Sequence, residues 1–110
     1  MVQKSKVTPE LIAEYERPFA GPAGRKAYLR AARALRSEEL VQRTAEIEQL
    51  AIPTLVAWGA QDEFQPLSYG RKLADAMQDA RLEVIEDAGH FLPEDAPQAL
   101  GKLIVEFAAT

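Results

Sequence analysis

Two hydrophobic runs, each ending in a glycine turn that carries an ionisable side chain, constrain the fold of this chain most strongly. The first run covers residues 53–59 and is followed by a carboxylate at Asp62. The second covers residues 81–86 and leads through a glycine to His90, the only histidine in the sequence. Continuous apolar or β-branched residues, as in Thr54-Leu55-Val56-Ala57-Trp58, are typical of a strand buried on both faces. The first run is therefore predicted to be such a strand. The second, Arg81-Leu82-Glu83-Val84-Ile85-Glu86, alternates between polar and apolar residues and predicts a strand nearer an edge of the sheet.

The segment between these strands predicts how they pair. Pro66-Leu67 is a helix start, and apolar residues follow at helical spacing over residues 66–78. A crossover of this length joins parallel strands, and ionisable groups then gather at the carboxyl ends of both strands. A sheet of only two parallel strands is not stable in water. The sequence is therefore interpreted as the last part of a larger sheet.

Helices are expected on both sides of this β-α-β unit. Three short ones are predicted before it, beginning at Thr8-Pro9-Glu10 and Gly21-Pro22 and running from Ser37 to Ile47. Their apolar faces are narrow, so they are expected to cover something else. A final helix, opened by Asp95-Ala96-Pro97, has the strongest amphipathic pattern in the chain. Its apolar stripe consists of Leu100, Leu103, Ile104 and Phe107.

The composition of the chain indicates a folded protein and argues against a nucleic-acid partner. Hydrophobic residues make up 47% of the chain, which favours a folded core over disorder. The net charge is −4, with most basic residues in the first half and most acidic residues in the second. No nucleic-acid partner is predicted, because the main basic set reads as the solvated face of one helix. That set is Arg25, Lys26, Arg30, Arg33 and Arg36.

The same inventory argues against membrane, metal and cofactor binding. Charges interrupt every window of about 18 residues, so no membrane span is expected. The start, Met-Val-Gln-Lys-Ser-Lys, lacks the apolar stretch of a secretory signal. Cysteine is absent, which fits a cytoplasmic location. With one histidine and no cysteine a metal site is not expected, and no phosphate-binding loop is present, so no cofactor is predicted.

These motifs resemble the C-terminal part of α/β-hydrolase-fold enzymes. Ile52-Pro53-Thr54-Leu55-Val56-Ala57-Trp58-Gly59, with Asp62 and then Pro66, is similar to the penultimate strand of that family. Residues 80–94, with Ala88-Gly89-His90-Phe91, are similar to its last strand and histidine turn. The resemblance implies an α/β fragment: residues 1–50 would be the end of a helical cap, and residues 51–110 the C-terminal β-α-β-α segment of the core.

The resemblance also implies roles for the two ionisable residues. Asp62 would orient the histidine and stabilise its charged form, and His90 would act as general base and acid of a triad. The nucleophile is missing, because no Gly-x-Ser-x-Gly or aspartate or cysteine variant occurs, nor any His-Gly segment for an oxyanion hole. Ser68 has a trailing glycine only and falls at a helix start. Glu63, adjacent to Asp62, points elsewhere and is interpreted as a surface residue.

Two hypotheses of function remain open. In the first, the chain contributes Asp62 and His90 to a hydrolase but turns over no substrate alone. The complete parent would act on a small molecule, cleaving an ester, or a carbon–halogen, epoxide or carbon–carbon bond. In the second, the chain is a non-catalytic interaction module. It would then pair with itself or with a partner lacking these elements, through an exposed sheet edge and apolar faces. Complementation by an N-terminal hydrolase fragment would instead belong to the first hypothesis.

Overall fold

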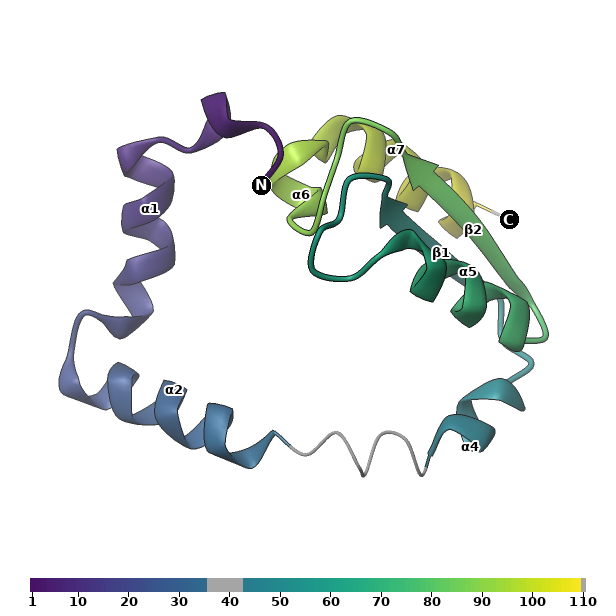
Figure 1. The fold of residues 1–110 in the computed structure, drawn as a ribbon, viewed down its shortest axis with the longest axis horizontal. Helices are drawn as coiled ribbons and strands as arrows, with labels where there is room; N and C mark the ends of the chain where they lie inside the picture. The colour runs from purple at the N-terminus through teal and green to yellow at the C-terminus, as the bar shows by residue number, and fades with distance from the viewer. Residues whose placement is uncertain (36–42, 110) are drawn as a thin grey trace. The chain divides into compact units, whose positions relative to one another are not determined.

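The computed structural model describes residues 1–35 and 43–109, and the chain divides into two compact units. One unit combines Met1–Lys6 with Ala45–Thr110, and the other is Val7–Thr44. Figure 1 traces both. The first unit contains the sheet and both sequence motifs, so the candidate site lies within it.

The described part of the unit Val7–Thr44 is helical. Helix α1 spans Pro9–Glu16, and the Thr8 side chain caps it by accepting the amide of Leu11 at 3.2 Å. A 3-10 turn, η2 (Arg17–Phe19), follows, and helix α2 spans Pro22–Ala34. The first two predicted helices are thus present with the predicted starts. None of these three elements contains a buried residue, as their narrow apolar faces suggested.

The third predicted helix is only partly within the described residues. Its expected start at Ser37-Glu38-Glu39, with Leu40 and Val41, lies outside them. The part that the structure describes is helix α4, Thr44–Glu48, which includes the predicted apolar residue Ile47. Ile47 is exposed. Residues 49–53 then connect α4 to the first strand.

The sheet has the predicted parallel pair. Strand β1 spans Thr54–Gly59 and strand β2 spans Ala80–Ile85, in register from Thr54 opposite Ala80 to Gly59 opposite Ile85. Helix α5, Leu67–Ala76, makes the crossover between them. The order of strands and helices confirms the expected α/β fragment with two parallel strands.

Two short elements of the unit that contains the sheet were not expected from the sequence. Helix α6, Leu92–Asp95, follows the histidine turn and leads directly into helix α7, Pro97–Ala108. A 3-10 turn, η1, spans Lys4–Lys6 near the start of the chain. Pro97 opens the last helix as predicted, but its N-cap is Ala96 and has no side-chain cap. The side chain of the neighbouring Asp95 therefore does not cap α7 and makes other hydrogen bonds, described below.

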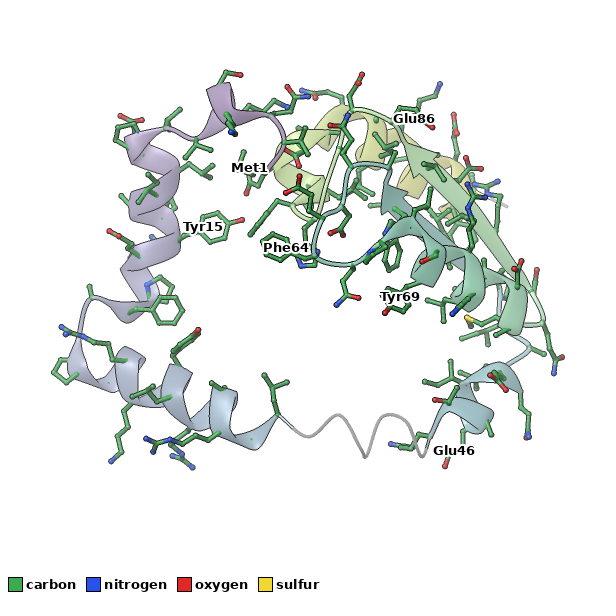
Figure 2. All side chains as sticks on the ribbon, in the orientation of Figure 1. Met1, Tyr15, Glu46, Phe64, Tyr69 and Glu86 are labelled. Carbon is green, nitrogen blue, oxygen red and sulfur yellow. The ribbon has the colours of Figure 1, made fainter. Side chains whose placement is uncertain are left out.

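The apolar faces of this unit are largely uncovered. Among the described residues the buried hydrophobic ones are Val56, 6% exposed, and Ala88, 0% exposed. Tyr69 on α5 projects from the ribbon (Figure 2), and Ile104 in the predicted stripe of α7 is also exposed. No helix in the described part of the chain has the length and hydropathy needed to cross a membrane. The exposure of these faces is what a sheet lacking further strands and helices would show.

Gly59, at the end of β1, allows the loop after β2 to approach the strand closely. A methyl group at this position would lie far inside van der Waals distance of the carbonyl oxygens of Ala88 and Gly89. Both neighbours are backbone atoms of buried residues, so they have little room to move. A side chain at Gly59 would push the histidine turn away from the strand.

We expect Gly59→Ala to destabilise this unit by about 1–3 kcal/mol, because the added carbon overpacks a rigid backbone contact. Urea unfolding followed by the fluorescence of Trp58, the only tryptophan, measures the loss. Gly101→Ala on α7 is the matched control, because a methyl group there meets nothing within 4 Å. The control should be neutral or more stable by up to about 1 kcal/mol. Equal stability of Gly59→Ala and the wild-type chain would contradict this reading of the contact.

Candidate active site

The parallel strands bring Asp62 and His90 together. The loop after β1 carries Asp62, and the loop after β2 carries His90. The Nδ1 atom of the imidazole lies 2.9 Å from Oδ2 of the carboxylate. The two loops are also joined directly, because the Gln61 side-chain amide donates to the Glu86 carbonyl at 2.9 Å. The sequence-predicted pair is therefore a hydrogen-bonded pair.

The two oxygens of Asp62 have different partners. Oδ1 accepts the backbone amides of Phe64 at 2.9 Å and Gln65 at 2.8 Å, which makes a tight turn after β1. Oδ2 is left for the histidine. The loop is held from its other side by the indole of Trp58, which donates to the Gln65 carbonyl at 2.9 Å. Two backbone amides thus orient the carboxylate independently of the histidine, and only 7% of its side chain is exposed.

The environment of Asp62 keeps it ionised. Burial alone would raise its pKa, but the Gln65 amide, the hydrogen bond and charge of His90, and the Phe64 amide together hold the pKa below its ordinary value of 3.8. An ionised carboxylate has only acceptors. The Nδ1 atom of His90 must therefore carry the proton in this hydrogen bond. In the neutral imidazole the other ring nitrogen, Nε2, then has no proton and can accept one.

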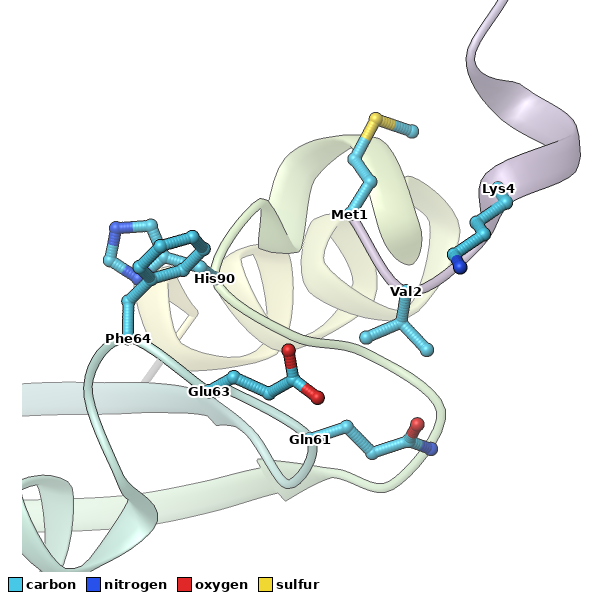
Figure 3. Close-up of a pocket in the computed structure, with 7 residues that line it drawn as sticks. All are labelled: Met1, Val2, Lys4, Gln61, Glu63, Phe64 and His90. Carbon is cyan, nitrogen blue, oxygen red and sulfur yellow. The ribbon is translucent and has the colours of Figure 1, made fainter.

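His90 stands at the edge of a small pocket, shown in Figure 3. The pocket has a volume of about 230 Å³, and the imidazole side chain is 44% exposed. The ring of Phe64 lies beside the imidazole, with 5.3 Å between ring centroids. The residues that line the pocket come from both strand-end loops and from the start of the chain: Met1, Val2, Lys4, Gln61, Glu63, Phe64 and His90.

The backbone just before the histidine is held by an acid that the sequence did not single out as functional. Asp95 is 4% exposed, and its Oδ2 accepts the amide of Gly89 at 3.1 Å. The pattern Asp95-Ala96-Pro97 predicted only a helix start. The available signal was a second acid close after the histidine turn, but a local helix cap is the commoner reading of such a residue.

The other sequence candidates have different positions. Glu63 is exposed, as expected, and is also among the residues that line the pocket with His90. Ser68 lies in the first turn of α5, is exposed, and is not among the residues that line this pocket. Within the described residues, no three or more His, Asp or Glu side chains cluster as a metal site would require. The chemistry that these residues offer is proton transfer at His90.

Comparison with known proteins identifies the family of this fold. The family model described as the alpha/beta hydrolase fold matches residues 11–97 of this chain. The chain belongs to the α/β-hydrolase fold family. The match includes both strands, Asp62 and His90.

Curated relatives are longer than this chain. An uncharacterised hydrolase, YugF, of Bacillus subtilis is 28% identical over 104 residues, which cover 94% of this chain and 37% of the relative. The 2-hydroxy-6-oxo-6-phenylhexa-2,4-dienoate hydrolase of Comamonas testosteroni is 31% identical, over 97% of this chain and 37% of the relative. Mouse monoacylglycerol lipase ABHD6 is 33% identical over 58% of this chain and 19% of the lipase. The matched residues therefore span between 19% and 37% of the length of these relatives.

Solved structures show the same fold. A predicted CIB-like hydrolase from Thermoplasma acidophilum aligns with a TM-score of 0.57 at 25% identity, over 59% of this chain and 31% of that protein. The α/β hydrolase MGS-MChE2, from a metagenome of lagoon sediments at Mar Chica, Morocco, aligns with a TM-score of 0.62 at 18% identity. That alignment covers 90% of this chain and 44% of the enzyme. The arrangement of strands and helices is thus part of a larger known fold.

The lowered pKa of Asp62 predicts an acid-dependent loss of stability. Because the folded-state pKa lies below the unfolded value, the stabilisation is complete above about pH 4 and is lost as the pH falls through the folded pKa. We expect the free energy of unfolding to fall less steeply with acid in Asp62→Asn than in the wild-type chain. Urea unfolding of both proteins at a series of values from about pH 6 to about pH 2 measures the two slopes.

Asp75→Asn, an identical chemical change at an exposed position on α5, provides the control. It should retain the acid dependence of the wild-type chain. Asp95 has a pKa lowered in the same direction and is present in all three proteins, so some acid dependence remains in each. Superimposable slopes for Asp62→Asn and the wild-type chain would show that the carboxylate is not stabilised in its ionised form.

Proposed function

We propose that this chain supplies the acid and the general base of a nucleophile–histidine–acid triad in an α/β hydrolase. The observation that carries the proposal is the 2.9 Å hydrogen bond between Asp62 Oδ2 and His90 Nδ1 at the edge of a pocket. An aspartate and a histidine that were only exposed loop residues would not be expected to form a hydrogen bond in which the carboxylate is nearly buried. Here the carboxylate is nearly buried and oriented by two backbone amides, which is how an orienting acid is held.

In this proposal, His90 transfers protons through Nε2. Its neutral imidazole takes a proton from the nucleophile or from an attacking water molecule, and the resulting imidazolium later returns that proton to the leaving group. Asp62 keeps the Nδ1–H form of the ring and stabilises the imidazolium charge. The nucleophile, a Ser, Asp or Cys, and the oxyanion donors would lie in a segment of the enzyme outside these 110 residues. The covalent step therefore belongs to the complete enzyme.

The parent reaction is proposed to be hydrolysis of an ester or a similar bond in a small molecule. Its support is family membership together with relatives named as a monoacylglycerol lipase and as a dienoate hydrolase. Residues 1–50 are proposed to be the end of the helical cap. In such enzymes the cap and the pocket beneath it determine which substrate is accepted.

The activity of this chain should depend on the rest of the hydrolase. We expect the purified chain to cleave an activated ester such as p-nitrophenyl acetate no faster than His90→Ala, because a base without nucleophile or oxyanion donors gives little acceleration. A chimera in which the chain replaces the matching 37% of the Comamonas testosteroni hydrolase should hydrolyse that enzyme's named substrate. In the chimera, His90→Ala and Asp62→Asn should each lower kcat by roughly 10²–10⁴-fold.

Asp75→Asn in the chimera is the control and should retain the parent chimera's kcat. Circular dichroism confirms that each chimera is folded before its rate is measured. A folded, active chimera whose kcat is unchanged by His90→Ala would reject the role of this pair. Activity of the isolated chain that disappears in both His90→Ala and Ser68→Ala would instead identify Ser68 as a nucleophile.

A second candidate function, a non-catalytic interaction module, is favoured by the uncovered apolar side chains. Phe64 is 71% exposed, Val105 on α7 is 70% exposed, and each strand has one edge without a partner strand among the described residues. Apolar surface of this kind and open strand edges promote pairing with another chain.

If the chain is such a module, sedimentation velocity should show self-association that Val105→Glu weakens by on the order of tenfold or more, because a charge would be buried in the contact. Gln98→Glu, the same charge change at an exposed polar position on α7, is the control and should associate like the wild-type chain. A monodisperse monomer that binds no apolar dye would count against the module and leave the hydrolase proposal unaffected.

A further inference from the structure

Asp95 joins three backbone segments that are distant in sequence. Its Oδ2 accepts the amides of Gly89 at 3.1 Å and Val2 at 3.2 Å, and its Oδ1 accepts the amide of Gln3 at 2.9 Å. Both oxygens are thus occupied by backbone donors. Asp95 is also buried, at 4% exposure. Its carboxylate therefore links the start of the chain to the turn that carries the histidine.

Further contacts hold the N-terminal segment (residues 2–6) against the same turn. The Gln3 side-chain amide donates to the Asp87 carbonyl at 3.0 Å, and the Lys6 ammonium donates to the Asp95 carbonyl. The side chain of Val2 packs against Gly89 so closely that a methyl group at position 89 would lie 2.7 Å from Val2 Cγ2. The N-terminal segment is therefore fixed to the backbone on either side of His90.

The electrostatics of Asp95 depend on these donors. Burial alone would raise the pKa of its carboxyl group, but the amides of Gln3, Gly89 and Val2 outweigh burial and hold the pKa below its ordinary value. An asparagine side chain of the same shape would place an NH₂ group where an oxygen accepts a backbone N–H. At least one donor would then face another donor and lose its partner.

The position of Asp95 connects these contacts to the pocket. His90 follows Gly89 directly, so fixing the Gly89 amide fixes the backbone from which the imidazole reaches Asp62. The N-terminal segment contributes Val2 and Lys4 to the lining of the pocket that His90 borders (Figure 3). The Asp95 carboxylate thus fixes both the backbone next to His90 and the N-terminal segment that lines its pocket.

We propose that Asp95 is a positioning residue, which sets the orientation of His90 toward Asp62 by clamping the histidine turn to the N-terminal segment. The proposal rests on the proposed function of His90 as general base. It adds that the N-terminal segment is part of the apparatus that orients this base. Loosening the segment, without touching His90 or Asp62, should therefore alter the hydrogen bond between them.

Nuclear magnetic resonance of the full chain tests this, because the single histidine gives one unambiguous set of imidazole signals. The imidazole ¹⁵N shifts report the tautomer of His90 and its hydrogen bond to Asp62. We expect Asp95→Asn to shift these signals and to accelerate exchange of the Gly89 amide by on the order of tenfold, the effect of losing one hydrogen bond. Gln3→Pro, which removes only one of the three backbone donors, should shift the same signals less.

Two controls separate positioning from general destabilisation. Gln3→Ala retains the backbone donor to Asp95 and removes the side-chain contact with Asp87, and Asp75→Asn makes the same chemical change as Asp95→Asn at an exposed site. Asp75→Asn should keep the wild-type imidazole signals, and Gln3→Ala should shift them less than Gln3→Pro does. If Asp95→Asn does not fold, which Trp58 fluorescence reveals, Gln3→Pro decides alone. Wild-type imidazole signals in every folded variant would overturn the proposal, and this result does not depend on the activity of the chimera.

Discussion

The parallel pairing of β1 and β2 is the constraint on which the site depends. Both strands run six residues and stay in register to their last pair, Gly59 opposite Ile85, so their loops leave the sheet at the same level. An antiparallel pair would place the ends of the two strands about 20 Å apart, the length of six extended residues. A hydrogen bond of 2.9 Å between Asp62 and His90 is possible only with the parallel arrangement and its helical crossover.

Asp62 and Asp95 are both largely buried carboxylates near the histidine turn, and their charges are compensated in different ways. One oxygen of Asp62 accepts backbone amides, and the other is hydrogen-bonded to His90. The carboxylate is therefore held in place, and its charge can stabilise the imidazolium when the ring gains a proton. Asp95 gives both oxygens to backbone amides. Its charge is therefore fully engaged in holding chain segments together. The two side chains are chemically identical, so the difference lies in their positions: Asp62 is in the loop after β1, and Asp95 is the last residue of α6.

Local patterns predicted most of this fold, and long-range contacts account for what they did not predict. The apolar run of β1, the helical spacing after Pro66 and the proline at the start of α7 are signals carried by neighbouring residues. The family resemblance pointed to Asp62 and His90 from their spacing after two glycine turns. The docking of the N-terminal segment on Asp95 had no such signal, because its partners lie 92 and 93 residues apart. The exposure of Ile104 and Tyr69 could not be predicted either. An apolar stripe shows which face of a helix could be buried, but not whether another part of the protein covers that face.

The separation of these partners also makes the wall of the pocket a long-range feature of the fold. The backbone donors of Val2 and Gln3 lie 93 and 92 residues from Asp95 along the chain. The entropic cost of closing a loop grows only slowly with its length, so a few hydrogen bonds can hold even such distant segments together. The wall beside His90 therefore depends on a contact that spans most of these 110 residues.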